Sequence, residues 1–154
     1  MNKDDIKRKN KILIKYLQSL NLNDEFTFKG EFQTDSNTEK VVVVQETSGP
    51  KIVFYGNATP LFNYYSIQVF GLSIGESKSL SVDIGNLIGI SDYINVIYND
   101  PKTKKKYNEK WQIIFQQYSN PQPIEYLDIR RVGYTATLKC IVNLVARKEI
   151  ENND

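Results

Sequence analysis

Residues 41–89 read VVVVQETSGPKIVFYGNATPLFNYYSIQVFGLSIGESKSLSVDIGNLIG and hold most of the signals from which a fold can be predicted. The β-branched run Val41–Val44 favours a strand, which Gln45-Glu46-Thr47 extends. Ser48-Gly49-Pro50 predicts a turn. Ile52–Tyr55 then predicts the returning strand of a hairpin, or a partly extended arm.

The second half of this stretch predicts a strand followed by a helix. Residues 64–70 alternate, with Tyr65, Ile67 and Val69 on one face and polar residues on the other. Ser73 and Glu76 have the spacing of a capping box, so the helix should begin there. Its apolar stripe, at helical spacing, consists of Leu80, Ile84, Leu87 and Ile88. Gly89 follows the stripe and fits a C-terminal cap.

The N-terminal part predicts an amphipathic helix over residues 4–20. Its apolar face consists of Ile6, Leu13, Tyr16, Leu17 and Leu20. Its basic side, which we expect to be solvated, consists of Lys7, Arg8, Lys9, Lys11 and Lys15. Residues 26–32 contain three phenylalanines in a strand-like segment, and the polar tract 33–40 predicts a loop.

The C-terminal part predicts three further strands. Residues 93–98 indicate a short strand, and Trp111, Ile113 and Phe115 alternate with polar residues. Residues 119–123, Ser-Asn-Pro-Gln-Pro, predict a break. The clearest alternation runs over residues 132–145, and at fourteen residues this strand is longer than most. We predict that the polar residues 147–154 form a frayed tail.

These segments predict one α+β domain over residues 1–154. Its sheet should be mixed and mainly antiparallel, with the N-terminal helix and the central helix packed on it. A chain of 154 residues is long enough to bury a core of its own.

Composition argues against several classes of function. The chain has no histidine, which removes the usual general base and the commonest metal ligand. The lone cysteine, Cys140, excludes an internal disulfide and a zinc site built from several cysteines. The polar start has no apolar signal-peptide core, and no window approaches a membrane span. We therefore expect a protein of the reducing cytoplasm, without cofactor, metal or membrane, and not an enzyme.

Residues 71–75 spell Gly-Leu-Ser-Ile-Gly, the pattern of a hydrolase nucleophile elbow. Without a histidine to activate Ser73, helix capping is the favoured interpretation. Cys140 lies on the apolar face of the last strand, where a small buried hydrophobe is expected. The acidic residues in or near loops are expected to be solvated; they are Asp92, Asp100, Glu109, Glu125 and Asp128.

The most charged segment is residues 102–106, which hold four lysines. Because net charge is only +2, a solvated loop is the default interpretation. The loop is nevertheless a candidate surface for a partner or for the phosphates of DNA. Its candidate residues are Lys102, Lys104, Lys105 and Lys106.

Several segments together resemble the tail terminator family of long-tailed bacteriophages, which includes tail-completion and minor-capsid proteins. Residues 42–49, Val-Val-Val-Gln-Glu-Thr-Ser-Gly, are similar to the family's strand running into a Ser-Gly turn. Residues 65–71 and the helix over 76–88 are similar to its central strand and helix. Residues 119–123 and the strand over 134–145 are similar to its loop and closing strand.

The resemblance implies a structural virion protein rather than an enzyme. Such proteins form a hexameric ring that caps the tail tube, ends its polymerisation and joins the tail to the head connector. The implied location is the tail or neck of the virion, after assembly in the cytoplasm of the host bacterium. The implied partners are further copies of the chain, the tail-tube protein and the head–tail connector, with non-specific contact to genomic DNA. Four alternatives remain open: a head–tail connector or neck protein, a tail-tube subunit, a nucleic-acid-binding module that uses residues 102–106, and a small enzyme, against which the absence of histidine argues.

Overall fold

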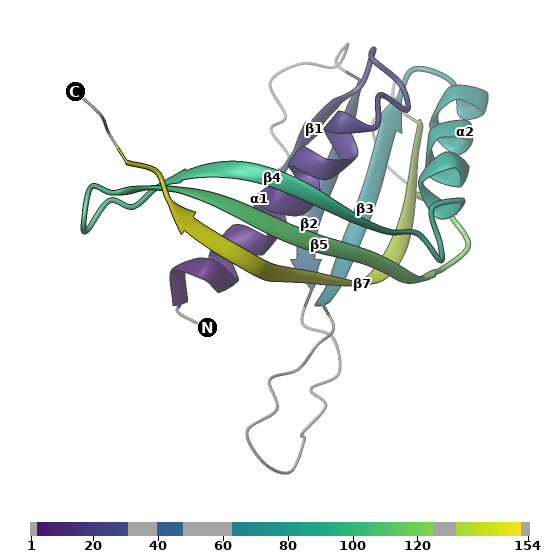
Figure 1. Cartoon of the computed structure of the whole chain (residues 1–154). Coiled ribbons are helices and arrows are strands. Elements are labelled where there is room, and N and C mark those ends of the chain that lie inside the picture. The colour runs from purple at the N-terminus through teal and green to yellow at the C-terminus, as the bar shows by residue number, and fades with distance from the viewer. Residues whose placement is uncertain (1–2, 31–39, 48–62, 125–131, 152–154) are drawn as a thin grey trace.

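A seven-stranded sheet organises the molecule. The computed structural model describes residues 3–30, 40–47, 63–124 and 132–151 (Figure 1). The elements, in chain order, are α1 (Lys3–Ser19), β1 (Thr27–Lys29), β2 (Val41–Thr47), β3 (Asn63–Gly71), α2 (Ile74–Gly85), β4 (Ser91–Asn99), β5 (Lys106–Tyr118), β6 (Gln122–Ile124) and β7 (Val132–Glu149).

The strand order is β1-β2-β3-β7-β5-β4, and β6 pairs with β7 beside this path. Only β1 and β2 are parallel; the other pairs are antiparallel. The predicted α+β class, with a mixed and mainly antiparallel sheet and two helices, is confirmed. Among the described residues, no helix is long and apolar enough to cross a membrane.

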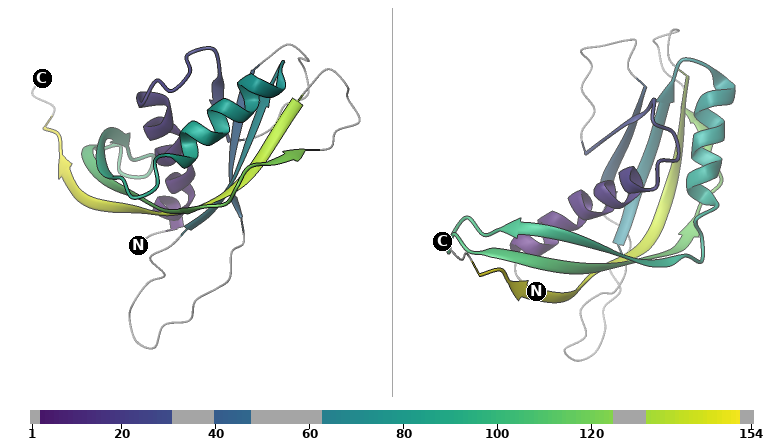
Figure 2. Two further views of the ribbon diagram at one scale, coloured as in Figure 1. Left: turned by 90° about the vertical axis from the view of Figure 1, so that its right-hand side faces the viewer. Right: turned by 45° about the horizontal axis from the view of Figure 1, so that its top comes forward.

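Both helices lie on the same, concave side of the curved sheet (Figure 2). The main core forms between them and the sheet, and it contains buried residues of α1, α2 and strands β2, β3, β5 and β7. The alternation of the strands explains this arrangement, because Tyr65, Ile67 and Val69 all face the core with no exposed surface. Trp111, Ile113 and Phe115 of β5 also face this core.

The start of α2 matches its prediction. Ser73 is the N-cap, and its hydroxyl accepts a hydrogen bond from the Glu76 amide at 3.3 Å. The Glu76 carboxylate makes an ion pair with Lys40, the residue directly before β2, so it ties the helix to that strand. Leu80 and Ile84 are buried as predicted.

The end of α2 differs from its prediction. The helix ends at Gly85 with Asn86 as C-cap, so Ile88 lies in the following turn with 40% of its surface exposed. Gly89 has a φ of +88°, which suits glycine, but it serves the turn into β4 rather than the helix cap. Gly85 has a packing reason, because a Cβ there would lie 2.7 Å from the ring of Tyr118.

Three other boundaries need correction. The strand predicted within residues 26–32 is the short β1, whose parallel partner is β2. The predicted break over 119–123 contains the start of β6, which pairs with β7 despite Pro123. The predicted tail is wrong in its first part, because β7 continues to Glu149 and pairs with β5. The predicted turn at 48–50, the strand over 52–55 and the loop over 33–39 lie outside the described residues.

Candidate interaction surface

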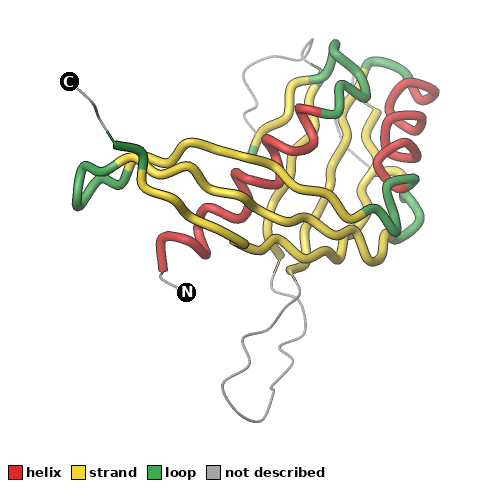
Figure 3. Tube along the Cα trace, viewed as in Figure 1, coloured by secondary structure: helices red, strands yellow, loops and turns green. Residues whose placement is uncertain are grey.

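Three strands extend beyond the rest of the sheet and form an arm. Within the described residues, β3 pairs with β7 as far as Cys140, and residues 141–149 of β7 have β5 as their one strand partner. The arm consists of residues 91–99, 106–114 and 141–149 of β4, β5 and β7. Figure 3 shows the arm projecting to the left, with the β4–β5 loop at its end.

Midway along the arm, β7 has one extra residue. Leu144 is opposite Trp111 and Ala146 is opposite Lys110, so Val145 is bulged out. The bulge shifts the inward-facing positions of β7 by one residue. Arg147 therefore comes opposite Glu109, on the face that α1 covers.

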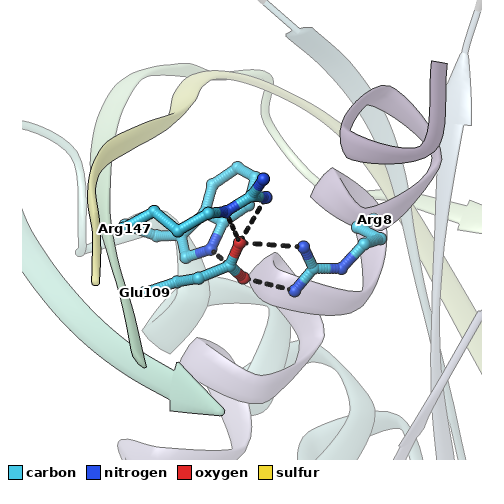
Figure 4. A network of polar contacts seen from close by, with 4 residues as sticks. Arg8, Glu109 and Arg147 are labelled. Carbon is cyan, nitrogen blue, oxygen red and sulfur yellow. Dashed lines mark hydrogen bonds and ion pairs between the residues drawn. The ribbon is translucent and has the colours of Figure 1, made fainter. Parts of the chain in front are cut away.

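Four residues form a network of polar contacts that joins the arm to α1, and this network is called the lock below (Figure 4). Glu109 lies at its centre, and its other members are Arg8, Trp111 and Arg147. The Glu109 side chain has no exposed surface, and it lies between Arg8 of α1 and Arg147 of β7. Arg8 donates from Nη1 to Oε2 at 3.2 Å and from Nη2 to Oε1 at 2.5 Å. Arg147 donates from Nε to Oε2 at 2.8 Å and also from Nη2. Trp111 Nε1 donates to Oε1 at 3.3 Å, so both carboxylate oxygens are fully engaged.

Aromatic rings complete the lock. The guanidinium carbon of Arg8 lies 3.5 Å from the centre of the Tyr98 ring, which is cation–π geometry. Arg147 lies 5.5 Å from the same ring and 5.3 Å from that of Tyr107. The two arginines are therefore held by both the carboxylate and the rings, and β4, β5, β7 and α1 meet at this point.

Burial alone would raise the pKa of the Glu109 carboxyl group. The hydrogen bonds from Arg8, Arg147 and Trp111 outweigh that effect, so its pKa lies below the usual range. Glu109 is therefore a charged, fully paired group at neutral pH. We interpret the lock as a positioning device for the arm, because every polar atom of the carboxylate already has a protein partner.

Sequence reasoning placed Glu109 among solvated loop acids, and that prediction is wrong. The signal that identifies it is the alternation of β5, in which Glu109 has the same parity as Trp111, Ile113 and Phe115. The basic side of α1 needs a similar correction. Arg8 belongs to the lock, and Lys9 is 7% exposed because it lies one turn before Leu13 on the buried stripe. Burial lowers the pKa of Lys9.

The four candidate lysines lie together at the end of the arm. Lys102, Lys104, Lys105 and Lys106 are all exposed, in the β4–β5 loop and at the first position of β5. Lys148 of β7 is also exposed, and it lies opposite Asn108, two residues after Lys106 in β5. The loop is therefore a basic tip, as predicted.

The other acidic candidates do not converge. Asp92 accepts a hydrogen bond from the Tyr16 hydroxyl at 3.0 Å, whereas Asp100 shapes the β4–β5 turn. Glu125 and Asp128 lie outside the described residues. Within the described ranges, no group of three or more His, Cys, Asp or Glu side chains could hold a metal ion.

Strand β4 is an edge of the sheet. In the part of the chain that the structure describes, its only partner is β5, so its other side presents backbone groups without a strand partner. Tyr93 and Ile97 point outward from it, with 47% and 56% of their surfaces exposed. The edge thus offers both backbone hydrogen bonds and apolar surface.

Ser73 and Cys140 take the structural roles that were predicted. Ser73 caps α2, and the Cys140 side chain is fully buried on the core face of β7. Burial raises the pKa of the Cys140 thiol to about 12, which leaves it protonated and unreactive in the folded protein.

Replacing Ser73 with alanine should lower the free energy of unfolding by about 1 kcal/mol, because the Glu76 amide loses its acceptor. Chemical denaturation would measure this loss, and Ser79→Ala on the exposed side of α2 is the control. An unchanged midpoint for Ser73→Ala would show that the cap contributes nothing.

Comparisons with known proteins add little to this description. No family model matches the sequence, and no curated protein matches it. One solved structure aligns over 95% of this chain and 99% of its own, with 10% identical residues and a TM-score of 0.47. Its description names no activity, and at this level of similarity the likeness carries no argument about function.

Proposed function

We propose that this chain is a structural subunit of a bacteriophage tail. In this proposal it assembles with further copies of itself into a ring that caps the tail tube, ends tube polymerisation and meets the head–tail connector. It acts in the tail or neck of the virion after assembly in the host cytoplasm, by binding rather than catalysis. The sequence resemblance to tail terminators suggests the family, and the edge strand β4 is the observation that supports self-assembly.

Strand β4 lacks several of the features that usually protect an edge, and Asp92 is its one charged residue. Its nine residues, SDYINVIYN, include no lysine, arginine or proline. Its pairing with β5 is continuous, without a bulge that would twist the edge away. A long, regular edge with exposed Tyr93 and Ile97 suits the addition of a strand from a neighbouring copy.

The ring geometry follows from the type of contact. A ring requires a heterologous interface, in which two different surfaces of each subunit meet and rotation closes the circle. β4 would supply one of these surfaces. A head–tail connector or a tail-tube subunit would use the same kind of contact between its copies. These roles differ from that of a tail terminator in the neighbouring ring to which the assembled ring binds.

The test is mass in solution over a range of concentrations, with negative-stain imaging of the largest species. We expect the wild type to form rings, and Ile97→Lys to remain monomeric with an unchanged circular dichroism spectrum, because the lysine protects the edge. Val82→Lys is the matched control, since Val82 is similarly exposed but lies on α2. Rings formed equally well by Ile97→Lys would exclude β4 as the interface, and a wild type that never assembles, even with tail tubes, would overturn the proposal.

A further inference from the structure

The basic tip of the arm is built as a fixed turn. The Lys104 amide donates to the Asp100 carbonyl at 2.8 Å, and the Asp100 amide donates to the Lys105 carbonyl at 2.9 Å. The Asp100 carboxylate accepts from the Lys102 amide at 2.9 Å. Lys104 has a φ of +58°, a conformation that favours glycine or asparagine, and yet the position carries a lysine. The turn is therefore held by its own hydrogen bonds, and its lysines are exposed.

Positive charge is concentrated on this part of the molecule. Residues 91–114 and 141–149 contain seven Lys or Arg and four Asp or Glu, whereas the rest of the chain contains thirteen and fourteen. The surplus in this region is 7 − 4 = 3 positive charges, and ion pairs such as Lys105 with Glu149 at 3.8 Å leave it unchanged because each removes one charge of each sign. The tip thus carries a local excess of positive charge that the overall charge of +2 conceals.

We infer that this tip binds the phosphate backbone of double-stranded nucleic acid without sequence preference, through Lys104, Lys105 and Lys106. Clustered lysines on an exposed loop provide the point charges that phosphates require, and contact with the backbone of a duplex does not require the loop to enter a groove. This binding activity goes beyond the proposed ring and does not depend on it.

The composition of the tip favours nucleic acid over an acidic protein. Residues 99–106, NDPKTKKK, contain no aromatic or large aliphatic side chain. Protein interfaces are usually depleted in lysine and are anchored by buried aromatic residues and arginine. The aromatic residues nearest the tip, Tyr98 and Tyr107, lie against Arg147 in the lock. The tip therefore offers charge without an apolar anchor, which suits a phosphate backbone.

The test measures binding of the full chain to a short fluorescent DNA duplex by anisotropy, at several salt concentrations. We expect binding at low salt, with a slope of log affinity against log salt that reflects the phosphates contacted. The triple variant Lys104→Gln, Lys105→Gln, Lys106→Gln should reduce that slope by up to about 3, since each phosphate contact contributes about 0.9. The matched control is Lys11→Gln, Lys15→Gln, Lys78→Gln, which removes the same charge from exposed helix positions and should retain the slope.

Three results would overturn the inference: no binding of the wild type at low salt, an equal loss in both triple variants, or displacement of the duplex by poly-glutamate at equal charge concentration. The last result would identify an acidic protein as the partner. Because ring formation is measured separately, by mass, failure of DNA binding leaves the proposed function standing, and failure of assembly leaves this inference standing.

Discussion

Replacing Glu109 with alanine should lower the free energy of unfolding by about 3–5 kcal/mol. The substitution removes the buried carboxylate that lies between Arg8 and Arg147, so two like charges remain close together without the anion that neutralises them. Trp111 Nε1 also loses its acceptor. Urea denaturation at neutral pH would measure the loss.

Glu149→Ala is the matched control for this experiment. Glu149 also pairs with a basic residue of the arm, but its side chain is 51% exposed and lies 3.8 Å from Lys105. Exposed pairs of this kind contribute at most about 1 kcal/mol. Equal losses in the two variants would show that the buried lock is no stronger than a surface ion pair.

The pH dependence of stability provides a second readout of the lock. Because the folded-state pKa of Glu109 lies below its unfolded value, its ionised form stabilises the fold above the unfolded pKa. That contribution is lost as pH falls through the folded pKa. The wild type should therefore lose stability in acid relative to Glu109→Ala, and parallel curves for the two proteins would contradict the assignment.

Ile84→Asp should unfold the protein. Ile84 has no exposed surface and lies in the main core between α2 and the sheet. An aspartate there places an unpaired charge among apolar side chains, one of the few single changes that costs about 4–5 kcal/mol or more. Since domains of this size have total stabilities of about 5–15 kcal/mol, little or no folded protein should remain.

Val82→Asp is the control that separates the cost of burying a charge from the cost of placing an aspartate in α2. It introduces the same residue into the same helix, two positions earlier, where the side chain is 41% exposed. This variant should remain soluble, with the far-ultraviolet circular dichroism spectrum of the wild type. A soluble and cooperatively folded Ile84→Asp protein would show that α2 does not lie on the core as described.

Most helices and strands could be predicted from local sequence, because the spacing of apolar residues matches the face of each element that is buried. The alternation of Tyr65, Ile67 and Val69 predicted β3, and the Ser73 cap predicted the start of α2. Strand order is not a local property. The sequences of β3, β5 and β7 do not show that β7 lies between the other two strands, because that arrangement depends on pairing across most of the chain.

The lock was missed for two physical reasons. Arg8 and Glu109 are 101 residues apart in sequence, so no spacing rule relates them. Arg147 faces the core only because Val145 is bulged, which breaks the two-residue period that predicted the rest of β7. After the bulge the polar residues no longer alternate with apolar ones, and the segment therefore resembled a solvated tail. The exposure of the basic tip could be predicted because a run of lysines favours solvent whatever the rest of the chain does.

The central position of β7 affects how the chain folds during synthesis. Of the described strands β7 is synthesised last, and yet it pairs on one side with β3 and on the other with β5. Until the ribosome releases it, β1-β2-β3 and β4-β5 are two partial sheets that share no strand and leave β3 and β5 as unpaired edges. Such long-range pairing slows folding, and the unpaired edges expose nascent chains to aggregation. The stage before β7 joins the sheet is therefore the one at which the chain is most exposed to aggregation, because two strand edges that are internal in the folded protein are still open.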